Sequence, residues 1–249
     1  MKNSKVLLAG ESWTSYTTHI KGFDAFYTSA YASGEKWIKA ALERGGYDFT
    51  FMPNHLVSDQ FPYTVEELSQ YSCIILSDVG SNTLLLPTAT FVSSQEKPNR
   101  CTVMRDYVLS GGSLLMVGGY LTFSGVDAKG RWGKTAVQDI LPVKVLDIDD
   151  RCEHCEGVAP VVVKPHKALE KISGTWPRFL GYNKTELLPG SELVMTIDGD
   201  PFIAFAQHGK GKSAVFTSDC SPHWGPTSFV EWECYDALWQ GIVGYLTDN

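Results

Sequence analysis

Apolar segments alternate with amphipathic ones along the first half of the chain. The four apolar segments are Lys5–Gly10, Tyr47–Met52, Ser72–Ser77 and Ser113–Val117. Short continuous apolar runs are typical of strands buried on both faces of a parallel sheet. Between these runs, helical spacing and capping residues predict helices at 33–44 (capped by Ser33), from about Thr64, and at Asn99–Leu109. This alternation predicts a doubly wound, mainly parallel α/β sheet.

The second half of the chain has a different pattern. Strands are predicted at Val158–Lys164, Glu192–Ile197, Phe202–Gln207 and Ser213–Ser218. Short turn sequences link the last three, which indicates an antiparallel meander that extends the sheet. We expect a short helix at Lys134–Ile140 and a final helix over Val230–Leu246. No repeat or linker appears, so we expect a single domain over residues 1–249.

Two stretches fit neither pattern. Trp13–Tyr31 is rich in aromatic and hydroxyl residues and is expected to be a long loop, serving either as a lid or as a subunit contact. Residues 83–98 are rich in Leu, Thr, Ser and Pro and are expected to be irregular.

Polar residues follow four of the predicted strands at the point where each ends. The segments are Gly10-Glu11-Ser12, Ser77-Asp78-Val79-Gly80, Gly118-Gly119-Tyr120 and Ser218-Asp219-Cys220-Ser221-Pro222-His223. Ligands of doubly wound sheets bind outside the carboxyl ends of the strands. We therefore expect one crevice lined by Glu11, Asp78, Tyr120, Asp219 and His223. The alternative is that these are ordinary strand-to-loop turns, which are usually polar.

The candidate residues fall into two groups. The catalytic candidates are Tyr120, His223, Asp219 and Glu11. The ligand-binding candidates are Ser12, Asp78, Gly80, Asn82, Gly118 and Gly119.

Motifs spread over nearly the whole chain resemble a family of bacterial cytoplasmic proteins described as glutamine amidotransferase-like. They are Gly10-Glu11-Ser12-Trp13, Lys21-Gly22-Phe23-Asp24, Leu76–Asn82, Met116–Gly125, Leu141-Pro142-Val143, Asp149-Asp150-Arg151 and Ser218–Trp224. The resemblance implies the class I glutamine amidotransferase fold, which is flavodoxin-like. Together with the four polar strand ends, the resemblance points to a site that binds or hydrolyses a small polar metabolite.

The chain departs from this family of enzymes at the nucleophile. Class I glutaminases carry Gly-x-Cys-x-Gly on a strained turn, whereas this chain has Gly118-Gly119-Tyr120-Leu121-Thr122. A phenol ionises near pH 10, above the range of a cysteine thiol. Tyr120 is therefore expected to donate a proton or hydrogen bond, or to pack over the crevice. Cys220, three residues before His223, is the other candidate nucleophile.

Composition excludes several classes of function. The 249 residues carry 21 Lys and Arg against 28 Asp and Glu, a net charge of −7, which disfavours nucleic acid and anionic membranes as partners. Met1–Lys5 leads into only five apolar residues, too few for an export signal. We therefore expect a cytoplasmic protein, whose six cysteines are mostly free thiols.

No metal or cofactor is expected. Cys152-Glu153-His154-Cys155 supplies only two thiolates, whereas structural zinc takes four ligands. Gly209-Lys210-Gly211-Lys212-Ser213 resembles a phosphate-binding loop but precedes a strand, so it is predicted to be a hairpin turn. Asp149-Asp150-Arg151 is expected to form a structural ion pair or to bind a polar ligand.

Two functional hypotheses follow. The first is an amidotransferase-like protein without the usual cysteine, which binds or hydrolyses a small polar metabolite at the strand-end crevice and can form a homo-oligomer. The second is a non-catalytic structural or oligomerising module with the same fold.

Overall fold

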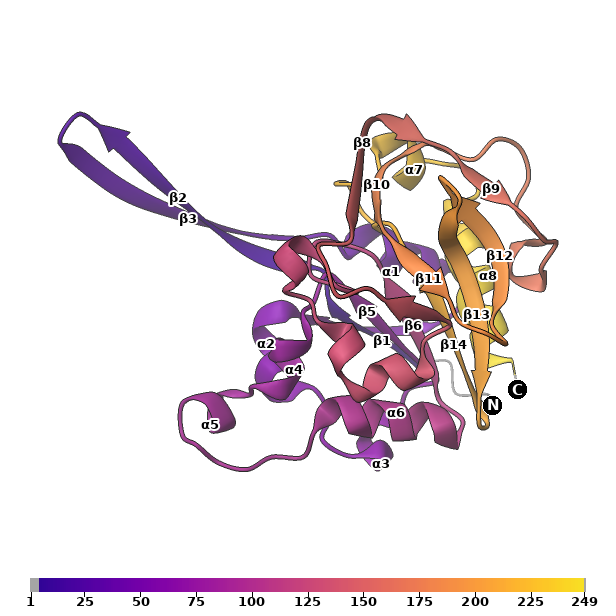
Figure 1. The fold of residues 1–249 in the computed structure, drawn as a ribbon, viewed down its shortest axis with the longest axis horizontal. Helices are drawn as coiled ribbons and strands as arrows, with labels where there is room; N and C mark the ends of the chain where they lie inside the picture. Colours follow the sequence, from indigo (N-terminus) through magenta and orange to yellow (C-terminus); the bar gives the residue numbers. More distant parts are fainter. Residues whose placement is uncertain (1–4, 249) are drawn as a thin grey trace.

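The computed structural model describes residues 5–248 and contains one eight-stranded sheet in the order β4-β1-β5-β6-β14-β13-β12-β9 (Figure 1). The prediction that the chain start is not an export signal partly concerns residues 1–4, which lie outside this range. In sheet order, the strands are β4 (Asp48–Pro53), β1 (Lys5–Gly10), β5 (Cys73–Ser77), β6 (Ser113–Val117), β14 (Gly211–Phe216), β13 (Asp200–His208), β12 (Glu192–Ile197) and β9 (Pro160–Val162).

The strands from β4 to β14 are parallel. If these five strands are numbered by their order along the chain, their order across the sheet is 2-1-3-4-5. This is one of the two common strand orders of doubly wound sheets, and its switch point lies between β1 and β5. From β14 to β9 the pairing is antiparallel. The predicted α/β class, the mainly parallel sheet and its antiparallel C-terminal extension are confirmed.

Helices cover both faces of the sheet and form two apolar cores. Alternate residues of each buried strand point to opposite faces; Val6 and Leu8 join one core, and Leu7 and Ala9 join the other. The first core includes side chains of α1 (Lys36–Arg44), α7 (Thr227–Val230) and α8 (Tyr235–Thr247). The second includes side chains of α2 (Asn54–Gln60), α3 (Val65–Leu68), α4 (Ser81–Leu85) and α6 (Arg100–Ser110).

Several helix boundaries differ from the prediction. Ser33 does not cap α1, because it is the last residue of a strand; the helix starts at Lys36, and its N-cap is Glu35. The predicted final helix begins five residues late, at Tyr235, because α7 and a turn precede it. Residues 83–98 are only partly irregular, since they contain the end of α4 and all of α5 (Thr88–Phe91).

Several short elements lie between β6 and β12 in the sequence. The helix predicted at Lys134–Ile140 is two 3₁₀ turns, Trp132–Lys134 and Ala136–Ile140; two others lie at Val126–Ala128 and Lys167–Leu169. Two small antiparallel sheets, not predicted, pair β7 (Val143–Val145) with β11 (Thr185–Leu187) and β8 (Arg151–Val158) with β10 (Phe179–Asn183).

The expected aromatic loop is a long β-hairpin. Strands β2 (Ser12–Lys21) and β3 (Asp24–Ser33) pair in continuous register from Ser12↔Ser33 to Lys21↔Asp24. The hairpin extends far from the rest of the molecule (Figure 1). Aromatic residues and threonine favour strands, and Gly22 supplies the positive φ of the hairpin turn.

Candidate functional site

A cavity of about 380 Å³ lies where the carboxyl ends of β1, β5, β6 and β14 meet. Its lining residues are Glu11, Trp13, Asp78, Tyr120, Asp219, Ser221, Pro222 and His223. The sequence placed five of these at one crevice, and the structure brings all five together. It adds Trp13, which directly follows the first predicted strand end, and Ser221 and Pro222, which lie within the last one.

Glu11 is a buried carboxyl held between two hydroxyl groups. Its backbone turns away from β1 with φ of 47°, and Ser77 Oγ and Ser221 Oγ donate to its two oxygens at 2.5 and 2.6 Å. Burial, with the nearby charges of Asp219 and Asp78, raises the pKa of Glu11 to about 7. At neutral pH this group can therefore give or take a proton.

Asp78 and Asp219 approach each other across Gly119. A Cβ on Gly119 would lie 3.1 Å from Oδ1 of each carboxylate, so only glycine leaves this space open. The Leu121 N–H donates to Asp78 Oδ1 at 2.9 Å. Burial and the charge of Asp219 nevertheless raise the pKa of Asp78 to about 6.

His223 and Asp219 form a hydrogen-bonded pair at the cavity wall. The distance between His223 Nδ1 and Asp219 Oδ2 is 2.7 Å, and the Trp224 N–H donates to the same oxygen at 3.1 Å. Because a carboxylate accepts, Nδ1 carries the proton and Nε2 is the second, free ring nitrogen. The hydrogen bond to Asp219 raises the pKa of His223.

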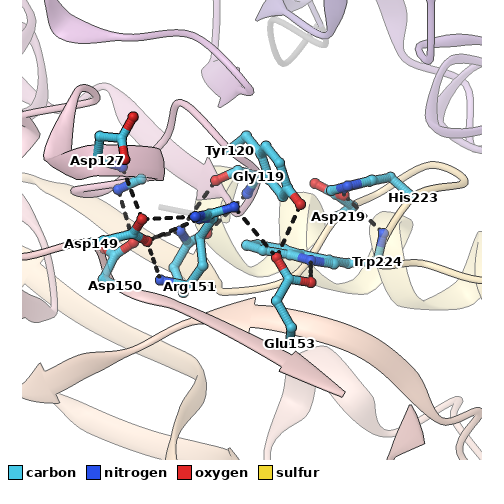
Figure 2. Close-up of polar contacts among 12 residues, drawn as sticks. Gly119, Tyr120, Asp127, Asp149, Asp150, Arg151, Glu153, Asp219, His223 and Trp224 are labelled. Atoms are coloured by element: carbon cyan, nitrogen blue, oxygen red, sulfur yellow. Dashed lines mark hydrogen bonds and ion pairs between the residues drawn. The ribbon is translucent and has the colours of Figure 1, made fainter. Parts of the chain in front are cut away.

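Tyr120 belongs to an aromatic and charged cluster beside this pair (Figure 2). Its hydroxyl donates to Glu153 Oε1 at 3.0 Å, and Trp224 Nε1 donates to Glu153 Oε2 at 2.8 Å. The Tyr120 and His223 rings pack edge to face, with their centroids 4.5 Å apart. The Arg151 guanidinium lies 4.7 Å from the centroid of the Tyr120 ring. Partial burial and the bond to Glu153 raise the pKa of Tyr120, so its phenol stays protonated at neutral pH.

Two buried polar residues hold the glycine turn that carries Tyr120. Asn183 accepts from the Gly119 N–H at 2.9 Å and donates to the Gly119 carbonyl at 3.1 Å. Asp150 accepts from the backbone N–H groups of Ser124 and Gly125 and from Asn183 Nδ2, each at 2.8 Å. Asp150 is therefore a structural anchor, while its neighbour Asp149 makes the ion pair with Arg151 at 2.8 Å.

The other predicted ligand-binding residues do not line the cavity. Ser12 is buried, and its hydroxyl accepts from the backbone N–H of Asn54. A Cβ on Gly118 would lie 2.4 Å from the Thr217 carbonyl oxygen, so Gly118 permits close strand packing. Gly80 precedes α4, and Asn82 is exposed on that helix. Gly119 lies between the Asp78 and Asp219 carboxylates but does not itself line the cavity.

Cys220 has neither access nor a lowered pKa. It is completely buried, and its sulfur lies 3.7 Å from Ser77 Oγ. Burial, reinforced by the charge of Glu11, holds the pKa of Cys220 well above its usual range. A buried thiol of this kind is a poor nucleophile.

We expect thiol alkylation to distinguish these environments. Native protein treated with iodoacetamide should be modified at Cys155, which is exposed, and not at the buried Cys73, Cys101 or Cys220. Peptide mass spectrometry before and after denaturation measures this. Rapid modification of Cys220 in the native protein would contradict its assignment as an inert thiol.

Within residues 5–248, neither a metal centre nor a helix able to span a membrane is found. No group of three or more His, Cys, Asp or Glu side chains within residues 5–248 is arranged to hold a metal ion. The Cys152 and Cys155 thiols on β8 are free. Over the same residues, no helix has the length and apolar character needed to traverse a bilayer.

Comparisons with known proteins cover almost the whole chain. A sequence model of a family described as "Putative glutamine amidotransferase" matches residues 5–248. A cytoplasmic protein from Salmonella typhimurium is 42% identical, with a TM-score of 0.94 over 97% of this chain and 98% of its own. A second, from strain LT2, is 40% identical, with a TM-score of 0.94 over 97% and 99%. A ThuA-like protein from Bacteroides uniformis shares the fold at 12% identity, with a TM-score of 0.51 over 96% and 90%. No curated protein sequence matches.

Proposed function

The chain belongs to the family described as "Putative glutamine amidotransferase", and on that premise we propose that its strand-end cavity binds and hydrolyses a small polar metabolite without a cysteine nucleophile. The observation that carries this proposal is the Asp219–His223 pair, which shares one cavity with two further carboxyl groups of raised pKa. Strongly perturbed ionisable groups in a cavity are characteristic of catalytic sites.

These groups supply the components of acid–base catalysis. Asp219 holds the His223 ring in one tautomer, so that Nε2 can take a proton from an attacking water and return it to a leaving group. Glu11, with a pKa of about 7, is partly protonated at neutral pH and can serve as a second acid. A direct attack by water activated in this way needs no covalent enzyme intermediate.

Tyr120 fits a binding role better than a nucleophilic one. Its raised pKa keeps the hydroxyl protonated, and its ring forms part of the cavity wall. We propose that Tyr120 and Trp13 contact the apolar faces of the ligand while the carboxylates bind its polar groups. A volume of about 380 Å³ suits a metabolite-sized ligand. Because both 40–42% identical relatives are described as cytoplasmic, we propose that the reaction takes place in the cytoplasm.

A thermal-shift screen of small polar metabolites tests the proposal. A ligand at a hundred times its Kd should raise the Tm of the wild-type protein by about 5–10 °C. His223→Ala should abolish both the shift and any turnover, and Tyr120→Phe should weaken binding. His208→Ala is the matched control, because His208 pairs with Gly211 at the start of β14, at the end of the strands opposite the cavity. Binding and turnover unchanged in His223→Ala would refute the assignment.

A further inference from the structure

The hairpin formed by β2 and β3 (Ser12–Ser33), here called the arm, exposes an unusual amount of apolar surface. Nearly all of its side chains are accessible, and Phe23 at its tip is fully exposed. Its exposed large hydrophobic residues are Trp13, Tyr16, Ile20, Phe23, Phe26, Tyr27 and Tyr31. Exposed apolar surface concentrated in one element marks an interaction site.

The composition and edges of the arm also indicate an interface. Lys21 and Asp24, at the tip, are its only Lys, Arg, Asp or Glu residues, although such residues form 20% of the whole chain. Interface cores are similarly poor in charge and rich in tyrosine. The arm has no proline, and its register is continuous. The arm therefore lacks the prolines and β-bulges with which proteins usually protect an open strand edge.

An isolated two-stranded hairpin is only marginally stable in water, so this arm requires a partner. With 22 residues from Ser12 to Ser33, it has the size of one side of a standard protein interface, which is about 20–30 residues. Two arms packed against each other therefore provide the surface that a stable dimer needs.

We propose that the partner is a second copy of this chain, with the two β2 strands paired antiparallel about a two-fold axis. Directly opposed residues of an antiparallel pair share a face of the sheet, so two-fold symmetry requires one residue to lie opposite its own copy. With Thr17 at this position, Lys21 of the second copy lies opposite Trp13, which lines the cavity. The tip of each arm thus completes the cavity of the other copy, where it adds a positive charge and the Phe23 ring.

Charge selects this pairing over its alternative. Pairing through β3 would instead bring Asp24 of the second copy opposite Ala32, the partner of Trp13, beside a cavity that already holds Glu11, Asp78 and Asp219. Lys21 at the same place complements these carboxylates. The dimer does not depend on catalysis, so it can be tested whether or not the proposed hydrolysis is correct.

Molar mass in solution is the first test. The wild-type chain should be a dimer by light scattering at micromolar concentration. Thr17→Asp should yield a folded monomer, because it places two carboxylates directly opposite each other at the two-fold axis, and like charges opposite each other destabilise a sheet. Phe91→Asp is the matched control, since Phe91 is 74% exposed on α5, away from the arm. A monomeric wild type, or a dimeric Thr17→Asp variant, would overturn the proposal.

A cross-link tests the antiparallel register. Ser15 and His19 are four residues apart on β2, about 13 Å in an extended strand, too far for a disulfide within one chain. In the proposed pairing Ser15 faces His19 of the second copy. Ser15→Cys/His19→Cys, made in a Cys155→Ser background, should therefore form a covalent dimer on oxidation, and either single cysteine variant should not. A double variant that stays monomeric on denaturing gels would rule out this register.

Discussion

Asp150→Ala should lower the free energy of unfolding by about 4 kcal/mol. The substitution removes the acceptor for the Ser124 and Gly125 N–H groups and for Asn183 Nδ2, all in a buried region. An unsatisfied buried donor costs about 1–3 kcal/mol. Because Asn183 in turn holds Gly119, the cavity should lose its shape, and ligand binding should weaken as well. Urea denaturation followed by tryptophan fluorescence measures the stability.

Two further variants show whether the lost acceptor is the cause. Asp150→Asn keeps one acceptor oxygen and should lose less stability than Asp150→Ala. Asp147→Ala removes an exposed carboxylate paired with Lys134, and should change stability by less than about 1 kcal/mol. Equal losses in Asp150→Ala and Asp147→Ala would contradict the anchoring role.

Glu11→Gln should stabilise the protein at alkaline pH and have little effect in mild acid. Burial and two neighbouring carboxylates raise the pKa of Glu11 from 4.5 to about 7. Between these values the folded state binds more protons than the unfolded state, so stability falls as the pH rises through this window. Above it, the ionised carboxyl costs about 3 kcal/mol. Glutamine cannot ionise and avoids this cost.

We therefore expect the Tm of Glu11→Gln to exceed that of the wild type by about 5–10 °C at pH 8, and by much less at pH 5. Glu96→Gln is the control, because Glu96 is exposed and outside the cavity. This variant should have the same difference in Tm between pH 8 and pH 5 as the wild type. The same Glu11 variant should lose ligand binding. A stability gain that does not depend on pH would show that Glu11 is not the group that titrates.

The parallel part of the fold was predictable because burial on both faces gives each strand a continuous apolar sequence. Cys73–Ser77 and Ser113–Val117, for example, are buried at every position. The helix boundaries were less predictable, since α1 begins without a side-chain cap. The β8–β10 pair gives a weak signal, because most of β8 lies near the surface and its sequence mixes charged residues with cysteine.

The hairpin was missed for a physical reason. Hydrophobic alternation marks a strand only when one face is buried, and both faces of β2 and β3 are exposed. Trp13, Tyr16, Ile20 and Phe23 therefore follow no period that burial within one chain would impose. Their pattern fits a surface that is covered only in an assembly, which is what we propose for the arm.

The polar strand ends in the sequence predicted the residues that line the cavity, but not the residues that hold them in place. The parallel topology alone brings Glu11, Asp78, Tyr120 and Asp219 to one edge of the sheet. Glu153 and Asn183, which hold Tyr120 and Gly119, come from β8 and β10. Those strands are distant in sequence and lie outside the main sheet, so no local pattern connects them to the cavity.

The backbone at two of the carboxylates bears on whether this site is still under selection. Glu11 and Asp78 have φ of 47° and 44°, a left-handed conformation that costs a non-glycine residue about 1 kcal/mol or more. Glycine would remove that cost, together with a buried charge, at both positions. Under neutral drift, a lineage that no longer used the cavity would gain stability through either substitution. The identity of residues 11 and 78 across relatives therefore separates members with a working site from those that have lost it.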